Sequence, residues 1–392
     1  SPSGDFDQSP VIPPVKIRSD DKETMEAAIV GLPNVGKSTL FNALTAAGAN
    51  SANYPFATVE PNIGVVAIPD PRLKILNQFV ETKKVVPTAL RVVDIAGLVR
   101  GASEGEGLGN RFLSHVRDTD AIIQVVRCFE DSPGSEEITH VEGTIDPLRD
   151  IETIEIELIL ADLQTVETAL KKATRAARGR EEETLLRLAA LEKLQPVLAQ
   201  GLPARKADLG SDPRTPEVMK GLGLITTKKQ MFVMNVADDD VQGEGKLAQQ
   251  VRTLAEERGG QAVAVCARIE EELSELDEED RAEMLVDYGM DEPALNKLAH
   301  AIYDLLSLQS FYTIGPKEIR AWTVRQGSTA HQAAGVIHTD FQRGFIRVEV
   351  HSVAEMQEYG SEKAIREAGK LRIEGKDYVM QDADVCHFLF NV

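Results

Sequence analysis

The sequence predicts an α/β fold with a mostly parallel sheet, an inserted helical hairpin and a small C-terminal α+β domain. A short apolar run at residues 27–30 ends in a glycine-rich turn, and a helical pattern follows it. Five more strand-like runs come later, with helix-length segments between most of them, at residues 64–68, 89–93, 121–126, 230–236 and 261–265. Because this alternation is typical of βαβ units, it predicts a mostly parallel sheet.

One region interrupts the alternation with helical periodicity alone, from residue 147 to about residue 201. Apolar residues recur there at 3-4-3 spacing in two stretches, at Ile151, Ile154, Leu158 and Ala161 and again at Leu191, Leu194 and Leu198. Gly179 lies between the stretches and is the expected turn. The pattern predicts a coiled-coil hairpin of two long helices inserted into the sheet domain.

The composition changes again after Leu308. Short β-rich runs flank a helix around residues 331–337, and they lie at residues 321–324, 345–350, 377–380 and 386–390. A unit of about 80 residues is within the range of a single domain. The expected domains are an extension (1–24), a sheet domain in two parts (25–146 and 225–308), the hairpin (147–224) and the C-terminal domain (309–392).

Composition limits the function classes. The chain has 43 Lys and Arg against 63 Asp and Glu, a net charge of −20, and no run of 18 apolar residues, so we expect neither a membrane span nor DNA binding. Three cysteines, Cys128, Cys266 and Cys386, favour a reducing compartment, the cytoplasm. Residues 1–24 are rich in Ser, Pro and Asp and are expected to be disordered. If they are the remnant of a targeting segment, the alternative location is the stroma of an organelle.

The charge is unevenly distributed. Residues 270–292 hold twelve acids and one base, a net of −11, and are expected to form an exposed acidic helix. Two regions are basic instead. The hairpin tip comprises Lys171, Lys172, Arg175, Arg178 and Arg180, and the C-terminal patch comprises Lys317, Arg320, Arg325, Arg343 and Arg347. Both regions are candidates for RNA contacts, and a solvated surface is the alternative.

Aromatic residues beside the C-terminal patch have two possible roles: they either stack on RNA bases or form the core of the domain. They are Phe311, Tyr312, Trp322, Phe341 and Phe345.

The turn after the first strand matches a phosphate-binding motif. Residues 31–38 read G-x-x-x-x-G-K-S, between a strand and a helix. In such a P-loop, Lys37 reaches the β- and γ-phosphates, the Ser38 hydroxyl ligates Mg²⁺, and backbone N–H groups cradle the phosphates. The expected nucleotide contacts are Asn34, Val35, Gly36, Lys37, Ser38 and Thr39. The motif predicts a P-loop NTPase domain.

Two further segments extend this site. Asp94 and Gly97 follow the strand at residues 89–93, the position of a metal-side aspartate and a glycine that senses the γ-phosphate. Thr58 is the candidate hydroxyl that completes the Mg²⁺ shell. Leu98 stands where signalling GTPases carry a glutamine that orients the attacking water, so hydrolysis is either slow or uses another residue.

Taken together, the P-loop, residues 54–62 and residues 94–110 resemble the Obg-like ATPase (YchF) family of translation-factor-related P-loop NTPases. Residues 146–167 resemble the start of the coiled-coil insert of that family, and residues 311–392 resemble its TGS domain, a ubiquitin-like fold. The resemblance covers residues 25–392. It implies binding to the ribosome, at the large subunit and its RNA, and a preference for ATP.

The resemblance also assigns the loops that read the base. Related GTPases recognise guanine through Asn-Lys-x-Asp, and the family carries Asn-x-x-Glu. This chain has Asn235, Val236 and, in the fourth position, Asp238. We expect ATP to be preferred and GTP tolerated, because the lysine is missing while the aspartate can still accept hydrogen bonds from guanine. Cys266 occupies the last base-contacting loop, where a buried structural role is the alternative.

For the missing glutamine, the resemblance implies His140 as the catalytic residue, beside Lys37. Asn34 raises the possibility of a bound K⁺ that assists hydrolysis. The expected function is a slow Mg²⁺-dependent ATP hydrolase that acts as a nucleotide-dependent switch in translation or the stress response. Two alternatives remain open: a GTP-dependent ribosome-assembly factor, and a binding protein that does not hydrolyse its nucleotide.

Overall fold

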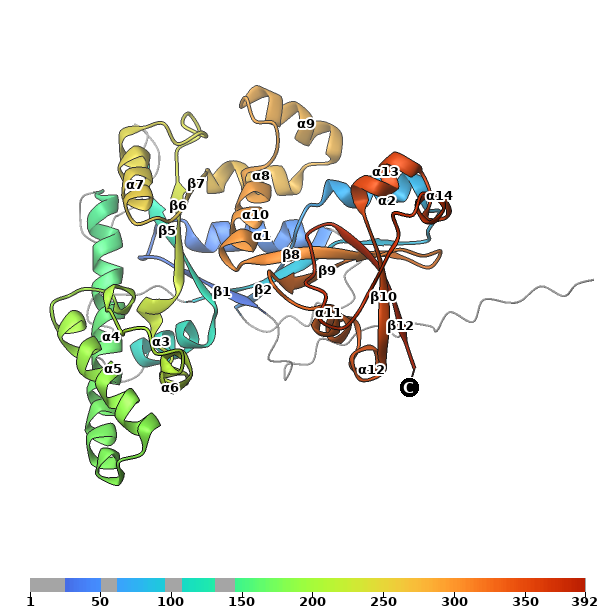
Figure 1. Cartoon of the computed structure of the whole chain (residues 1–392). Helices are drawn as coiled ribbons and strands as arrows, with labels where there is room; N and C mark the ends of the chain where they lie inside the picture. Colours follow the sequence, from blue (N-terminus) through green and yellow to red (C-terminus); the bar gives the residue numbers. More distant parts are fainter. Residues whose placement is uncertain (1–24, 51–61, 96–107, 131–144, 392) are drawn as a thin grey trace, which may run out of the picture.

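The computed structural model describes residues 25–50, 62–95, 108–130 and 145–391 (Figure 1). The extension expected at residues 1–24 lies outside this part of the chain. Within it, no helix is both long enough and apolar enough to cross a lipid bilayer.

The first sheet is mostly parallel, as the sequence predicts. Its strands lie in the order β2 (Ile63–Ala67), β4 (Ala89–Asp94), β1 (Glu26–Val30), β5 (Ala121–Arg127), β6 (Lys229–Asn235) and β7 (Ala262–Val265). The β2–β4 pair is antiparallel, and the other pairs are parallel. Every residue of β5 is buried, because helices cover both faces of a parallel strand in the middle of a sheet.

Helices pack on both faces of this sheet. On one face lie α1 (Lys37–Asn50), α3 (Leu108–Asp118) and α10 (Ala294–Leu305), and on the other lies α7 (Lys246–Glu257). The helix α8 (Ala267–Glu275) packs against α1 and contributes residues to the clusters of both faces. Successive side chains of a strand point to opposite faces. Met231 and Val233 of β6 therefore join the first cluster, and Phe232 and Met234 join the second.

The predicted helical hairpin is present, and it extends away from the sheet (Figure 1). It comprises α4 (Pro147–Ala176) and α5 (Glu182–Ala199). The 30 residues of α4 span about 45 Å at 1.5 Å per residue. The helix starts sharply because the Asp146 side chain accepts a hydrogen bond from the Arg149 N–H and Pro147 opens the first turn. All seven apolar residues that the sequence pattern identifies are buried.

The turn of the hairpin lies where the sequence predicts it. A short 3₁₀ segment, Ala177–Gly179, ends α4, and Arg180 then adopts the left-handed conformation, with φ of 57°. The chain returns to the sheet through Ala204–Lys206, α6 (Thr215–Met219) and Ile225–Thr227. Asp162 holds this return segment against α4. It is fully buried, and it accepts hydrogen bonds from the backbone N–H groups of Ile225 and Thr226, at 2.8 and 2.7 Å.

The C-terminal domain forms a second, mixed sheet. Its strands lie in the order β11 (Arg372–Glu374), β10 (Phe345–Ser352), β12 (Asp384–Phe390), β8 (Leu308–Thr313), β9 (Ile319–Arg325) and β3 (Val85–Val86). Four helices of the described chain belong to this domain: α11 (Ala330–Ile337), α12 (Thr339–Arg343), α13 (Val353–Tyr359) and α14 (Glu362–Glu367). The α+β architecture and the helix near residue 331 agree with the expectation from the sequence.

The prediction of a strand at residues 377–380 is wrong. Only Val379 makes an isolated bridge, to Thr329, and the strand of this region lies earlier, at Arg372–Glu374. The backbone around Tyr378 bonds instead to the start of α11, where the Ala330 N–H donates to the Tyr378 carbonyl at 2.8 Å. A nearby helix N-terminus with unpaired N–H groups has therefore taken the hydrogen bonds that a strand would use.

Two elements that precede the hairpin in the sequence, α2 (Pro71–Phe79) and β3, pack on the second sheet. Strand β3 pairs with β9, with Val85 opposite Ile319, and α2 places Leu73 and Leu76 in the core beside Tyr312. The Arg72 guanidinium also bonds to both Asp70 and Asp382. This shared core joins the C-terminal domain to the chain that precedes the hairpin.

The acidic segment forms two helices rather than one. They are α8 and α9 (Glu278–Asp287), and α9 is not buried at any position. Glu270 differs from the other acidic residues of this segment because its side chain is buried. It lies at the start of the segment, where its Oε1 accepts a hydrogen bond from the Ala294 N–H at 2.7 Å. Burial raises the pKa of Glu270 to about 7.

Candidate nucleotide-binding site

The P-loop connects β1 to α1 in a compact turn. The Gly36 carbonyl accepts the first helical hydrogen bond of α1, from the Leu40 N–H at 3.0 Å. Asn34 and Gly36 both have positive φ, 63° and 88°. A Cβ at Gly36 would lie 2.1 Å from Asn235 Nδ2. Glycine is therefore required at position 36, both for its backbone conformation and for its close contact with another loop.

Lys37 and Asp94 meet beside the P-loop, although 57 residues separate them in the sequence. Strands β1 and β4 are neighbours, with Ile29 opposite Asp94, so the residues at their carboxyl ends lie at one edge of the sheet. Lys37 Nζ contacts Asp94 Oδ1, and the lysine is 7% exposed. The structure thus brings together the expected phosphate-binding lysine and the expected metal-side aspartate.

Asn235 links the P-loop to the other end of the site. Its amide Nδ2 donates to the Val35 carbonyl at 2.9 Å, and its Oδ1 accepts from the Ala267 N–H at 3.1 Å. Asn235 is 6% exposed, so neither bond competes strongly with water. One side chain therefore holds the P-loop against the first residue of α8.

Asp238 forms an ion pair that the sequence analysis does not anticipate. Arg268 Nη2 lies 3.0 Å from Asp238 Oδ2, and Arg268 Nε lies 3.4 Å from Glu272 Oε1. The two carboxylates, Asp238 before Glu272, raise the pKa of Arg268. The sequence signal for this pair is the position of Arg268, two residues after Cys266 and two residues before an acidic run that begins at Glu270.

The side chains of two expected base-contacting residues point into the core. Val236 is 1% exposed and Cys266 is 6% exposed, and both belong to the hydrophobic cluster under α7 and α8. Burial raises the pKa of the Cys266 thiol. The Val236 N–H is also bonded to the Val265 carbonyl, at 3.1 Å. Little of either residue beyond the backbone is available to a nucleotide.

The remaining expected site residues divide into two groups. Ser38 and Thr39 lie in the first turn of α1, Ser38 exposed and Thr39 half-buried. Thr58, Gly97 and His140 lie outside the described residues, as does Leu98.

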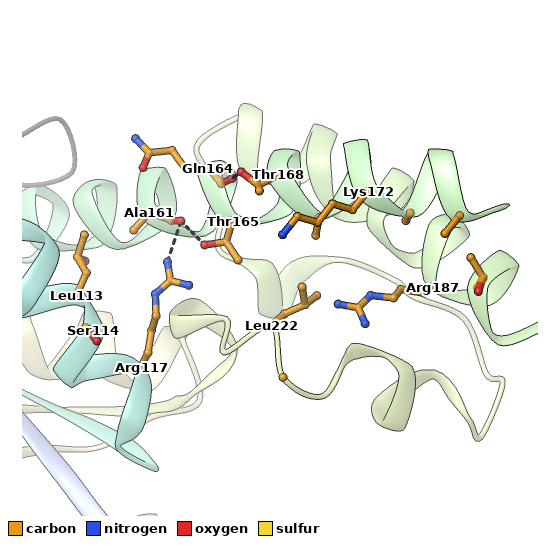
Figure 2. Close-up of a pocket in the computed structure, with 15 residues that line it drawn as sticks. Leu113, Ser114, Arg117, Ala161, Gln164, Thr165, Thr168, Lys172, Arg187 and Leu222 are labelled. Atoms are coloured by element: carbon orange, nitrogen blue, oxygen red, sulfur yellow. Dashed lines mark hydrogen bonds between the residues drawn. The ribbon is translucent and has the colours of Figure 1, made fainter. Parts of the chain in front are cut away.

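A cleft of about 860 Å³ lies between α3 and the hairpin (Figure 2). Its described lining contains Arg117, Lys172 and Arg187 but no carboxylate. Arg117 of α3 donates to the Ala161 carbonyl of α4 at 3.1 Å, and Lys172 and Arg187 extend into the cleft from α4 and α5. All five bases of the hairpin tip are exposed, and Lys172 belongs to both the tip and the cleft. The exposed acids Glu181, Glu182 and Glu183 follow the tip at the start of α5.

The C-terminal patch is less basic than its composition indicates. Three of its arginines form ion pairs, Arg320 with Glu318, Arg325 with Asp120 and Arg343 with Asp340. The aromatic residues beside the patch belong to the core rather than to an exposed stacking surface. Phe311 is fully buried and Trp322 is 7% exposed in one hydrophobic cluster, against which Phe341 and Phe345 pack, and Tyr312 is fully buried in a second cluster.

Two family models match the chain. The model described as "50S ribosome-binding GTPase" matches residues 26–167, and the YchF-GTPase C-terminal model, described as "Protein of unknown function (DUF933)", matches residues 308–391.

Relatives match almost the whole chain. The "Ribosome-binding ATPase YchF" of Haemophilus influenzae is 50% identical and that of Bacillus subtilis 46% identical, each over 94% of this chain and over 99% and 100% of the relative. The solved structure of the Schizosaccharomyces pombe YchF GTPase matches with a TM-score of 0.83 and 38% identity, covering 94% of this chain and 98% of that one. With this identity over nearly its full length, and with a solved YchF structure that matches at a TM-score of 0.83, the chain belongs to the YchF family.

Proposed function

We propose that the chain is a slow, Mg²⁺-dependent ATPase that acts as a nucleotide-dependent switch on the ribosome. The observation that carries this proposal is the contact between Lys37 and Asp94 beside a P-loop that needs glycine at position 36. The choice of ATP as substrate and of the ribosome as partner is supported by the relatives named as ribosome-binding ATPases.

The P-loop residues suit a nucleoside triphosphate and its metal. The donors are all oxygen atoms, the Ser38 hydroxyl and the Asp94 carboxylate, with Thr58 proposed as a third, and oxygen ligands are those that Mg²⁺ prefers. No group of three His, Cys, Asp or Glu that could hold a metal occurs among the described residues, so phosphate oxygens would complete the shell. Held by these residues, Mg²⁺ would neutralise charge on the phosphates of the nucleotide.

Lys37 and Asp94 would exchange partners when nucleotide binds. The lysine, now paired with Asp94, would turn to the β- and γ-phosphates, and the aspartate would be free for the metal. Each charge thus has an opposite charge both before and after binding, so neither is left buried and unpaired. The ion pair therefore keeps both side chains in place for the substrate.

Hydrolysis is proposed to be slow because leucine occupies position 98, and a hydrocarbon side chain cannot orient a water molecule. His140 is proposed to supply that role, and Asn34, exposed in the P-loop, is proposed to ligate K⁺. Replacing His140 with alanine should lower turnover while leaving ATP affinity within about twofold. Unchanged turnover in this variant would remove His140 from the mechanism, and equal rates in K⁺ and Na⁺ would remove the K⁺ site.

The ribosome contact is proposed at the hairpin tip, with the adjoining cleft beside α3. Its exposed bases would bind RNA phosphates, so binding should weaken as salt rises. Reversing the charge of Lys171, Lys172, Arg175, Arg178 and Arg180 should abolish co-sedimentation with ribosomes. The matched control reverses Lys246 and Lys297, exposed lysines of α7 and α10. Co-sedimentation of the tip variant at the level of the unmodified chain would exclude the tip.

The central experiment measures affinity for ATP and GTP and turnover with and without ribosomes. We expect tighter ATP binding, turnover that requires Mg²⁺, and loss of nucleotide binding in Lys37→Ala. A tenfold preference for GTP, about 1.4 kcal/mol, would instead identify a GTP-dependent assembly factor. Binding without turnover, even with ribosomes, would identify a nucleotide-dependent binding protein. Work on ribosomes would place the chain in the cytoplasm or in the stroma of an organelle.

A further inference from the structure

We infer that Arg268 helps to set the base preference of the nucleotide site, because it holds the Asp238 carboxylate that guanine would need. The inference rests on the proposed function, since it concerns the base of the nucleotide that the P-loop binds. It adds to the site a residue that neither the sequence pattern nor the family comparison assigns.

The fold brings Arg268 and Asp238 to the place where a base would lie. Strands β6 and β7 are parallel neighbours, with Asn235 opposite Val265, so the loops that follow them lie at the same edge of the sheet. This is the carboxyl edge at which the P-loop also lies, and open α/β sheets bind their ligands there.

The position of Arg268 is fixed relative to the P-loop. The neighbouring residue, Ala267, donates its N–H to Asn235 Oδ1, and Asn235 Nδ2 donates to the Val35 carbonyl. The three loops therefore form one hydrogen-bonded unit. The Val236 side chain is buried in the core and does not reach this edge. The charged side chains of Arg268 and Asp238 do reach it, and they are 69% and 37% exposed.

Guanine and adenine differ in the hydrogen bonds that they can make with the Asp238 carboxylate. Guanine carries two donors on one edge, the N1–H and the 2-amino group, and a carboxylate is the acceptor that matches them. Adenine has an acceptor at N1 and no 2-amino group. An Asp238 carboxylate whose Oδ2 lies 3.0 Å from Arg268 Nη2 has part of its accepting capacity engaged, so guanine must compete with the arginine for this carboxylate, whereas adenine has no donor at N1 that needs it. The guanidinium also presents only donors.

The inferred effect is modest because both partners are partly exposed. Exposed ion pairs are weak, so Arg268 should lower guanine affinity rather than exclude GTP. This agrees with a site that prefers ATP and tolerates GTP. We expect removal of Arg268 to shift the ratio of GTP to ATP affinity about threefold toward GTP, which corresponds to about 0.65 kcal/mol.

The test is a double-mutant cycle on the full chain, with the dissociation constants of Mg·ATP and Mg·GTP measured for each protein. The variants are Arg268→Ala, Asp238→Ala and the double variant. Arg268→Ala should shift the affinity ratio toward GTP, and the second substitution should reverse that shift. Removing Asp238 should therefore lower GTP affinity at least twofold more in the Arg268→Ala background than in the unmodified chain.

A matched control keeps Arg268 and removes its other partner. Glu272→Gln neutralises the carboxylate that lies 3.4 Å from Arg268 Nε, and the affinity ratio should stay within twofold of the unmodified chain. An unchanged ratio in Arg268→Ala, or an equal loss of ATP and GTP affinity, would overturn the inference and leave the proposed function intact. If the unmodified chain bound neither nucleotide, the proposed function itself would fail.

Discussion

Asn235 offers a direct test of how the nucleotide site is assembled. Replacing it with alanine removes two buried hydrogen bonds, the Nδ2 bond to the Val35 carbonyl and the bond from the Ala267 N–H to Oδ1. Each leaves a partner buried without a bond, which costs about 1–3 kcal/mol. We expect Asn235→Ala to lower the free energy of unfolding by about 2–6 kcal/mol.

Asn235→Asp separates the two bonds. Aspartate keeps an oxygen acceptor for the Ala267 N–H but replaces the donor facing the Val35 carbonyl with a second oxygen. The acceptors of the carboxylate and the carbonyl then face each other in a site that is 6% exposed. At pH 8 we therefore expect Asn235→Asp to destabilise the chain at least as much as Asn235→Ala. At pH 4 the loss should be smaller, because a protonated carboxyl can donate to the carbonyl.

The assay is urea denaturation followed by circular dichroism, with nucleotide affinity measured on the folded variants. Gln249→Ala, which removes an exposed amide of α7, is the control and should change stability by less than about 0.5 kcal/mol. A change of that small size in Asn235→Ala would refute the reasoning that this side chain fastens the P-loop to α8. A loss of stability with unchanged nucleotide affinity would show that the bridge serves folding alone.

Three further predictions follow from buried polar groups and one strained turn. Burial raises the pKa of Glu270 from its usual 4.5 to about 7, so the folded state binds this proton more tightly and stability falls as pH rises through that interval. Glutamine does not titrate, so the free energy of unfolding of Glu270→Gln should exceed that of the unmodified chain by up to about 3 kcal/mol at pH 8 and by little at pH 4. Urea midpoints of the two proteins that differ by the same amount at pH 8 and pH 4 would contradict this. Asp162→Asn should destabilise the hairpin return segment by about 2 kcal/mol in urea, because its amide turns a donor toward backbone N–H groups, and an unchanged midpoint would argue against that contact. Gly36→Ala should abolish nucleotide binding, because its Cβ would overlap Asn235, whereas Gly179→Ala meets no atom within 4 Å and should bind normally.

Local patterns were sufficient for the hairpin and the P-loop. The 3-4-3 spacing in 147–201 identifies the buried stripe of each helix because the 3.6-residue period is a property of the helix itself. The P-loop is likewise contiguous, and its glycines, lysine and serine act within eight residues. Both predictions needed no knowledge of the rest of the chain.

Prediction was weakest where one segment competes with another for hydrogen bonds. The run at residues 377–380 has the composition of a strand, yet its backbone bonds to the start of α11. Strand β3 has only two residues and pairs with β9, more than 200 positions away. Whether β3 and residues 377–380 form strands depends on which segment lies beside each of them, and composition does not encode that neighbour.

The sequence by itself determined the order of the domains, the P-loop and the membership of the chain in its family, because each depends on local periodicity or on a contiguous motif. The tertiary structure decided how the loops that were expected to contact the base are arranged. It buries the side chains of Val236 and Cys266, makes Asn235 a bridge between loops, and pairs Asp238 with Arg268. Those roles arise because parallel strands from distant parts of the sequence end at one edge of the sheet, and only that arrangement places their side chains within hydrogen-bonding distance.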